Sequence, residues 1–299
     1  MGTELAESGR DVLFVEEGSW VSTDAFNPYS SESIPRLYRD AAATVILGNP
    51  PIPYVEGRCV GGSTTINGGM AYRPPERVLD QWAKISPDLS ARALEPLFER
   101  VEKQVSVGPQ LPESIGDDNR VMTDGARKMG WSYTVNQRNQ QACVGANNCG
   151  FGCPTGAKQS TLVTYMPRAL AAGARCLTEL KVERLWIEAG RAVGVIARAV
   201  CPRTRRAGAE VRVRARAVVV SCGAVQTPYL LLGHKLGRPS RQLGKNFHCH
   251  PNAKVVAIYP HDIQGWRGVS QSSQIRHFHE DGILMAENFV TPSVLGAYL

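Results

Sequence analysis

The sequence predicts an α/β fold, and three stretches carry this prediction. A helix-forming run at residues 3–8 is followed by an apolar strand at 12–15. A glycine-rich loop at 57–75 leads into a helix-forming segment, and an apolar strand ending at 218–220 breaks into a helix at 229–232. Helices that alternate with apolar strands in this way are typical of a mostly parallel sheet covered by helices.

The composition fits a folded protein of one large or two smaller domains. The chain has 299 residues, of which 43% are hydrophobic and 20% charged, so disorder is not indicated. Much of the formal charge of +7 comes from an arginine-rich segment at 203–216. Such a segment could bind nucleic acid. From residue 211 on, however, arginines alternate with apolar residues, which favours a solvated turn between two strands and no nucleic-acid partner.

Targeting and membrane signals are absent from the sequence. No run of about 20 apolar residues occurs, so we expect no transmembrane segment. The first residues lack the basic and then apolar order of a signal peptide, so a cytoplasmic location is expected. If the N-terminus is truncated, a targeting signal upstream would be missed.

The remaining elements are predicted from the spacing of apolar residues and from the positions of turn-forming residues. Residues 19–56 are rich in Pro, Ser and Asn and predict an irregular excursion. In the helix at 94–104, Leu94, Leu97, Phe98 and Val101 have the spacing of a buried face. The other expected elements are helices at 77–82 and 121–129, strands at 177–186, 192–200 and 211–220, and a second sheet formed from 255–260 and 283–290.

Glu16 directly follows the strand at 12–15. A carboxylate at the C-terminal end of a parallel strand can accept hydrogen bonds from both hydroxyls of a ribose, as in dinucleotide-binding βαβ units. A solvated acid at a strand end is the alternative interpretation.

The segment Gly61, Gly62, Ser63, Thr64 and Asn67 is a more specific signal. Paired glycines let the backbone approach a diphosphate, and successive N–H groups followed by a helix N-terminus form an anion-binding concavity. The two hydroxyls add donors and can cap the helix. An ordinary flexible loop would explain the glycines but not their ordered arrangement.

A third turn begins at Gly223 and Ala224, after the strand ending at 220. The helix that follows is expected to start with Thr227 as its N-cap and Pro228 at its first position. This geometry brings backbone close to a nucleotide at the end of a parallel strand. By itself it is also compatible with any strand-to-helix turn.

Together these motifs resemble the glucose–methanol–choline (GMC) flavoprotein oxidoreductases. The matching stretches occur in order along nearly the whole chain: Glu16 after VLFV, GRCVGGSTTINGG, CGFGCPTGAKQST and VVVSCGAVQTPYLLL. The resemblance implies an incomplete, Rossmann-like FAD-binding domain at 1–250, with a cysteine-rich loop inserted at 142–160. It also implies the start of a sheet-based substrate-binding domain at 251–299.

The same resemblance implies FAD as cofactor and assigns its contacts. Glu16 would hold the adenosine ribose, Val182 would contact the adenine through its backbone, and Gly223 and Ala224 would pass close to the nucleotide. The residues that would line FAD near its diphosphate and isoalloxazine are Gly61, Gly62, Ser63, Thr64, Asn67 and Gly68.

The implied reaction is oxidation of an alcohol to a carbonyl by hydride transfer to flavin N5. The cysteine loop is most similar to the bacterial branch that acts on long-chain or bulky alcohols, with oxygen, a quinone or a cytochrome as electron acceptor. The family's GxGxxG turn would lie upstream and its catalytic histidine pair beyond Leu299. No catalytic residue is therefore expected in this chain, and alone it is expected to be inactive and to bind FAD weakly.

Four histidines do not match the catalytic pair and are interpreted as packing or hydrogen-bonding residues: His248, His250, His277 and His279. A degenerate flavoprotein that serves as a binding or interaction module, or one piece of a split enzyme, is the alternative function. A partial sequence is the simplest explanation of the missing motifs.

Cys143, Cys149 and Cys153 form a compact thiol cluster in sequence. Three soft thiolates at this spacing could ligate a [3Fe-4S] cluster, and some dehydrogenases of the family resemble this pattern. The same loop without metal, and a disulfide between two of the three, remain alternatives.

Overall fold

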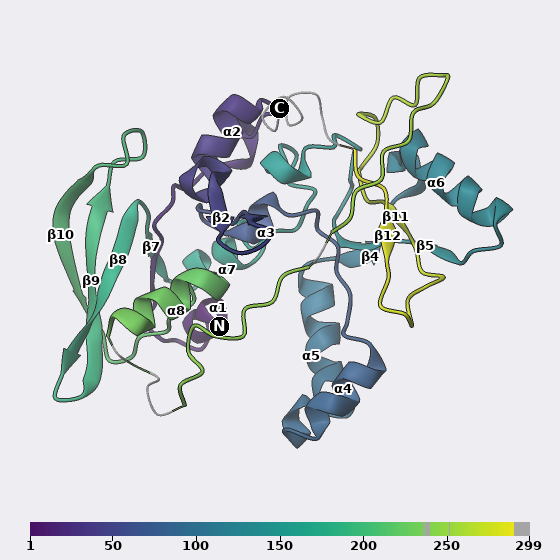
Figure 1. Cartoon of the computed structure of the whole chain (residues 1–299). Helices are drawn as coiled ribbons and strands as arrows, with labels where there is room; N and C mark the ends of the chain where they lie inside the picture. The colour runs from purple at the N-terminus through teal and green to yellow at the C-terminus, as the bar shows by residue number, and fades with distance from the viewer. Residues whose placement is uncertain (235, 237–239, 251, 290–299) are drawn as a thin grey trace. The chain divides into compact units, whose positions relative to one another are not determined.

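The computed structural model describes residues 1–234, 236, 240–250 and 252–289 of the chain, which has the mixed α/β fold that the sequence predicts (Figure 1). It divides into two compact units. The first comprises Met1–Val12, Trp20–Ala174 and the segment from Pro260, and the second comprises Leu13–Ser19 and Arg175–Tyr259. The domain boundary expected at residue 250 stays a prediction, and residues 251 and 290–299 of the expected second domain lie outside the described residues.

The first unit combines helices with short strands. Its helices are α1 (Gly2–Glu7), α2 (Ser30–Leu37), α3 (Ser63–Ile66), α4 (Glu76–Ala83), α5 (Ala91–Gln104), α6 (Asp117–Lys128) and α7 (Tyr165–Ala171). Two antiparallel pairs join β2 (Thr44–Ile46) to β3 (Ile52–Tyr54) and β4 (Val107–Pro109) to β6 (Gln137–Asn139). A three-stranded sheet has the order β12 (Met285–Ala286), β11 (Ser273–Ile275), β5 (Tyr133–Val135).

The N-terminal helix α1 packs on α7, which follows the cysteine-rich loop. Ala6 and Ala169 are both buried at this contact, because small side chains let two helices approach closely. Thr3 donates from Oγ1 to the Tyr165 carbonyl at 3.1 Å, and Arg168 forms a bidentate ion pair with Glu7. The beginning of the chain is therefore fixed to the segment that follows the cysteine loop.

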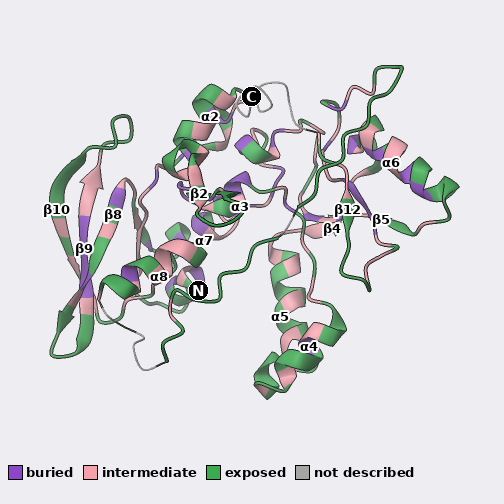
Figure 2. Ribbon diagram, in the orientation of Figure 1, coloured by how far each residue is buried: buried purple, intermediate pink, exposed green. Residues whose placement is uncertain are grey.

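The second unit is built on strands. β1 (Leu13–Val15) pairs in parallel with β7 (Arg175–Leu177). β8 (Leu180–Glu188), β9 (Arg191–Val200) and β10 (Ala207–Arg214) form an antiparallel meander. The helix α8 (Gly223–Gly233) packs on β8, and Leu185 of β8, Val195 of β9 and Leu230 of α8 form a buried cluster. Figure 2 shows buried stretches on these three elements.

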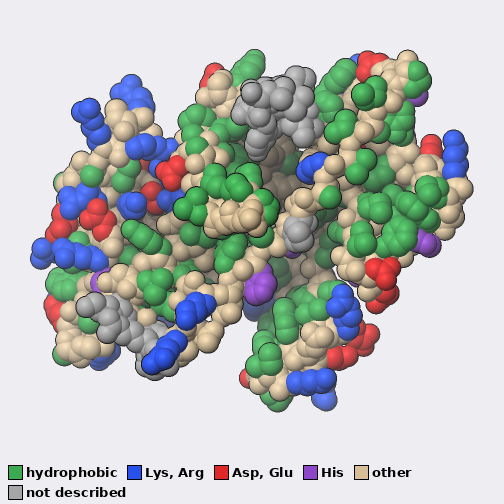
Figure 3. Space-filling model, in the orientation of Figure 1, with side chains coloured by type: hydrophobic (Ala, Val, Ile, Leu, Met, Phe, Trp, Pro, Cys, Tyr) green, Lys and Arg blue, Asp and Glu red, His purple; other side chains and the backbone are tan. Residues whose placement is uncertain are grey.

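The first part of the arginine-rich segment, residues 203–206, lies in a turn between two strands, as the sequence predicts. It connects β9 to β10, and beyond it the intermediate burial of Val211 and Val213 alternates with exposed arginines. Arg212 pairs with Glu210, and Arg214 with Glu188. Basic and acidic side chains are accordingly interleaved over this sheet rather than forming a purely basic surface (Figure 3).

Several expected elements are wrong in position or extent. The strand expected at 211–220 ends at Arg214, since Val218 and Val220 pack against the α8 cluster instead of pairing in a sheet. The following helix begins at Gly223, so Thr227 lies inside it. Thr227 still satisfies a donor there, because its Oγ1 accepts from the Cys222 N–H at 2.9 Å.

The strand expected at 255–260 is also wrong, since the described residues of this segment form no strand. Met285–Ala286 confirms a short strand within 283–290. The apolar face expected on α5 is not buried, with Leu97 46% and Val101 43% exposed. Amphipathic spacing predicts a buried face only where a partner covers it, and the contacts of α5 with α4 and of Phe98 with Arg73 cover this one only in part.

Within the described part of the chain, no helix has the length and apolar character needed to cross a membrane.

Candidate functional site

The residues expected around the adenosine of FAD share the second unit. Glu16 follows β1 directly, and its N–H donates to the Leu177 carbonyl at 2.9 Å, which continues the parallel β1–β7 pairing by one residue. Its own carbonyl accepts from the Leu180 N–H at 2.9 Å, and its carboxylate accepts from the Gly18 N–H at 2.7 Å. Glu16 therefore stands at the C-terminal end of a parallel strand and against the start of β8.

Val182 lies two residues further along β8. The register with β9 is regular from Leu180 to Val182, and backbone groups in an antiparallel ladder alternate between the two edges of a strand. Because the Leu180 N–H points to Glu16, Val182 presents its N–H and carbonyl to the same edge. A β-bulge between Val182 and Arg184 shifts this alternation. After the bulge, the Leu185 N–H points to the same outward edge and donates to His234 Nε2 at 2.8 Å.

Gly223 and Ala224 are the first two residues of α8. Gly223 has φ +87°, a conformation that residues with a side chain rarely adopt, so the glycine is required by this turn. The helix ends beside His234, which is the residue that holds Leu185. The helix α8 therefore begins at Gly223, one predicted nucleotide contact. At its other end, His234 binds Leu185, which follows Val182, another predicted contact, by three positions in β8.

The glycine-rich loop lies in the first unit and is closely packed on itself. A Cβ built on Gly57 would lie 2.5 Å from the Gly62 carbonyl carbon and 2.7 Å from the Ser63 nitrogen. A Cβ on Gly61, at φ +90°, would collide with Thr65 Oγ1. Around Gly62, at φ +52°, a Cβ would meet nothing within 4 Å. Gly57 and Gly61 are thus required by packing, whereas Gly62 borders open space.

The polar groups of this loop shape its own backbone. Ser63 Oγ accepts from the Gly57 N–H at 3.0 Å, Thr64 Oγ1 donates to the Gly61 carbonyl at 2.6 Å, and Asn67 Oδ1 accepts from the Gly69 N–H at 3.0 Å. The hydroxyls do not cap the helix. Gly62 is the N-cap of the single turn α3, and no side chain caps it.

Arg58 is a residue of this loop that sequence reasoning missed. Its side chain is only 5% exposed, and its buried Nε has no hydrogen-bond partner among the residues that the structure describes. Burying a guanidinium without a partner costs several kcal/mol, so such a group calls for an anion. The signal in the sequence was its position next to the glycines.

Two further buried cations, Lys158 and Arg138, contact the same loop and were also missed. Lys158 donates to the carbonyls of Thr65 and Asn67, and Arg138 donates to the carbonyl of Gly68. Burial lowers the pKa of Lys158 to about 8, against the opposing effect of Cys149 and Cys153. Lys158 belongs to the CGFGCPTGAKQST stretch, but its long-range contacts could not be read from the sequence.

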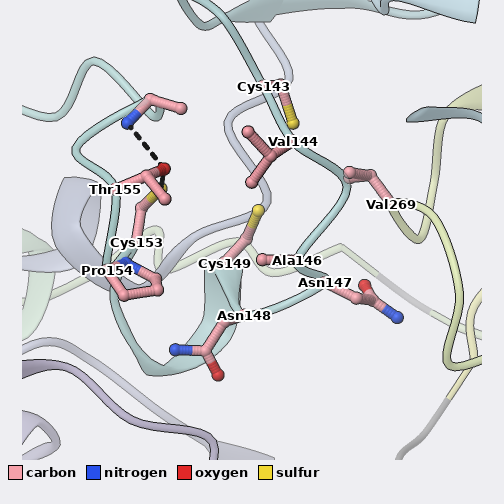
Figure 4. Close-up of a pocket in the computed structure, with 11 residues that line it drawn as sticks. Cys143, Val144, Ala146, Asn147, Asn148, Cys149, Cys153, Pro154, Thr155 and Val269 are labelled. Carbon is pink, nitrogen blue, oxygen red and sulfur yellow. Dashed lines mark hydrogen bonds between the residues drawn. The ribbon is translucent and has the colours of Figure 1, made fainter. Parts of the chain in front are cut away.

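The three cysteines line one small pocket of the first unit (Figure 4). All three are free thiols. Hydrogen bonds from Thr155 and the Lys158 N–H lower the pKa of Cys153 although burial opposes this. The volume of this pocket that the centre of a water molecule can reach is about 20 Å³, which is enough for one or two water molecules. Among the described residues no group of three or more Cys, His, Asp or Glu side chains is arranged to hold a metal ion.

The histidines occupy packing or solvent positions. His248 and His250 are exposed, His277 stacks on Trp131 at 6.0 Å between ring centroids, and His279 Nε2 lies 3.2 Å from an Arg276 nitrogen.

Comparison with known proteins identifies the family. Residues 11–252 match the family of GMC oxidoreductases.

The chain belongs to the GMC oxidoreductase family.

An uncharacterized GMC-type oxidoreductase of Mycobacterium tuberculosis is 36% identical over 98% of this chain and 46% of its own length. A long-chain-alcohol oxidase of Arabidopsis thaliana is 24% identical over 91% of this chain and 36% of its own length. This GMC chain thus spans about half or less of the length of these two relatives.

Solved structures agree on the GMC fold. Pyridoxine 4-oxidase from Mesorbium loti superposes with a TM-score of 0.56 at 16% identity, over 77% of this chain and 48% of that one. An FAD-dependent oxidoreductase from Chaetomium thermophilum gives a TM-score of 0.54 at 16% identity, over 77% of this chain and 45% of that one.

Proposed function

We propose that the protein containing this chain binds FAD and oxidises an alcohol to a carbonyl. The observation that carries the proposal is the junction of β1 with β8, where Glu16 and the outward edge of Val182 are held together by the Leu180 hydrogen bond. A carboxylate that can accept hydrogen bonds from ribose hydroxyls, next to outward-facing backbone groups that can bind an adenine, is an arrangement suited to an adenosine. Membership of the GMC family, and a long-chain-alcohol oxidase among the relatives, support the reaction class.

The residues present fit FAD in charge and in shape. Arg58 is a buried cation with an unsatisfied Nε in the glycine-rich loop, and a diphosphate is the anion of this cofactor. Gly62 leaves open space on the same loop. Gly223 lets the backbone begin α8 without a side chain at its first position.

Each predicted contact has a role in the proposal. In the second unit, Glu16 accepts from the ribose hydroxyls, the Val182 backbone reads the adenine edge, and Gly223 and Ala224 give close approach. In the first unit, the glycine-rich loop serves the diphosphate and isoalloxazine. The residues of this loop with that role are Gly61, Gly62, Ser63, Thr64, Asn67 and Gly68.

When bound, FAD supplies a flavin N5 that accepts the hydride from the carbinol carbon. The residues of this chain contribute binding and orientation of the cofactor. That no residue of this chain supplies the base, and that the chain alone is inactive, stay predictions. The alcohol is proposed to be long-chain or bulky, with oxygen, a quinone or a cytochrome as acceptor, and the compartment stays a prediction.

The three-iron cluster lacks structural support. Among the described residues, Cys143, Cys149 and Cys153 line one pocket but are not arranged to hold a metal ion. We therefore leave the cluster outside the proposal. Stoichiometric iron and acid-labile sulfide in the purified protein would show that a cluster is present.

The proposal is tested by cofactor binding in the protein as it is encoded, with any in-frame flanking sequence included. Glu16→Gln removes an ionic acceptor, and we expect about 10- to 100-fold weaker binding of FAD, with riboflavin binding unchanged. Glu17→Gln is the matched control, because it changes the neighbouring acid. Equal FAD affinity in Glu16→Gln and wild type would contradict the assignment, and folded protein that binds no FAD would overturn the function.

One measurement separates the proposed function from the alternative, a degenerate flavoprotein that acts as a binding module: whether an alcohol reduces the bound FAD. The alternative predicts bound FAD that no primary alcohol reduces under anaerobic conditions. The proposed function predicts bleaching of the flavin absorbance by a long-chain alcohol.

A further inference from the structure

Lys158 is a buried ammonium enclosed by backbone carbonyls. Its side chain is 5% exposed, and Nζ donates to Thr65 O at 2.7 Å, Asn67 O at 2.7 Å and Cys149 O at 2.6 Å. These three bonds use all the donors that an ammonium has. They join the glycine-rich loop to the cysteine-rich loop through one side chain.

Arg138, from β6, likewise donates to a backbone carbonyl of the glycine-rich loop, that of Gly68, the residue after Asn67. Its side chain is 3% exposed and donates from Nη2 to the Gly68 carbonyl and from Nη1 to the Ser270 carbonyl at 2.9 Å. Nη2 also lies 3.4 Å from Cys149 Sγ. The carbonyls of Asn67 and Gly68 are therefore each directed at a buried cation.

Neither cation has an acidic partner. The described residues place no carboxylate within ion-pair distance of Lys158 or Arg138, although exposed arginines elsewhere in the chain pair with Glu or Asp. Carbonyl dipoles offset part of the desolvation cost of the two charges but do not cancel them. Two positive charges thus remain buried beside residues 65–68.

This arrangement fixes the direction of one peptide group. In a trans peptide the carbonyl and the N–H point to opposite sides. Since the Asn67 carbonyl faces Lys158, the Gly68 N–H faces away from it. The Gly68 N–H has no hydrogen-bond partner within the described ranges, and Gly68 is only half-buried. The loop therefore presents an available donor on the side opposite the cation.

We propose that Lys158 and Arg138 are positioning residues for the flavin: they hold the carbonyls of residues 65–68 inward so that the Gly68 N–H donates to the bound isoalloxazine, and their uncompensated charge favours the reduced, more negatively charged cofactor. The proposal rests on the function proposed above and extends it to two residues outside the predicted contacts. Reduction adds electrons to the flavin, so a fixed positive charge raises the reduction potential.

The test measures the affinity of the protein for FAD and the midpoint potential of the bound flavin. Lys158→Gln keeps two N–H donors and removes the charge, whereas Lys158→Arg keeps the charge. We expect Lys158→Gln to lose about 10-fold of the preference for reduced over oxidised FAD, which is about 30 mV for a two-electron couple. Lys158→Arg should stay closer to wild type. Arg138→Gln should shift the potential in the same direction as Lys158→Gln.

The exposed Lys128 on α6 provides the matched control, because Lys128→Gln removes the same charge away from the loop. Thermal unfolding of each variant reports whether the fold is retained. If Lys158→Gln does not fold, the comparison of Lys158→Arg and Arg138→Gln with wild type decides the question. Wild-type potentials and affinities in folded Lys158→Gln and Arg138→Gln would overturn the inference while leaving FAD binding intact. Failure of the wild type to bind FAD would instead refute the proposed function.

Discussion

Glu287 provides a prediction about stability that is independent of any cofactor. Its carboxylate accepts from Asn119 Nδ2 at 2.7 Å and from the Gln271 N–H at 3.0 Å, in a largely buried position. Burial, followed by a hydrogen bond and charge repulsion from Asp118, raises the pKa of Glu287 to about 8.

The sign of the pH dependence follows from this raised pKa. Below the ordinary value of 4.5 both the folded and unfolded states hold the proton, and the contribution of Glu287 to stability is fully present. As the pH rises toward 8, the unfolded state gives up its proton while the folded state keeps it, so the free energy of unfolding falls. A shift from 4.5 to about 8 sets a ceiling of about 5 kcal/mol, and the interaction with the neighbouring Asp118 reduces the contribution of Glu287 alone to a few.

The assay is urea denaturation between pH 4.5 and 8.5, followed by circular dichroism. Glu287→Gln mimics the protonated carboxyl, so its free energy of unfolding should vary less with pH than that of wild type and exceed it at pH 8.5. Glu280→Gln, an exposed substitution on the same segment, should follow wild type. A Glu287→Gln protein with the same pH profile as wild type would refute the raised pKa of Glu287.

Two further substitutions test the glycine-rich loop. Gly61→Ala should lower the free energy of unfolding by about 2–4 kcal/mol, because the added Cβ collides with Thr65 Oγ1 at φ +90°. Gly130→Ala, at φ +70° with nothing within 4 Å, should cost only about 1 kcal/mol, and equal losses in urea denaturation would contradict the packing argument. Arg58→Met should weaken FAD binding about 10- to 100-fold while leaving riboflavin binding near wild type, as measured by flavin fluorescence, and it should not lower the thermal stability of the apoprotein, because it removes a buried charge. A comparable loss for riboflavin would assign Arg58 a structural role instead.

Local patterns predicted the positions of several elements but not their surroundings. The strand at 12–15 and the acid after it could be read from a few neighbouring residues, and β1 with Glu16 lies where expected. The turn at Gly223 was recognised, but the start of its helix was placed too late, because Thr-Pro is also tolerated inside a helix's first turns. The face of α5 was predicted to be buried because spacing alone does not reveal whether a partner exists.

The cations around the glycine-rich loop could not have been found from the sequence. Lys158 lies 91 residues from Asn67, and Arg138 lies 70 residues from Gly68. Lys and Arg are ordinarily exposed, so burial is the feature that marks them, and burial depends on the tertiary structure. The cysteine spacing, in contrast, suggested a metal site more strongly than the small pocket supports.

The most direct test of the account is to release and identify the flavin of the purified, folded protein, and to titrate apoprotein with FAD in wild type, Glu16→Gln and Glu17→Gln. The account predicts that denaturation releases FAD, that wild type and Glu17→Gln bind it alike, and that Glu16→Gln binds it about 10- to 100-fold more weakly. A folded protein that takes up no FAD, or equal affinities in all three, would contradict it.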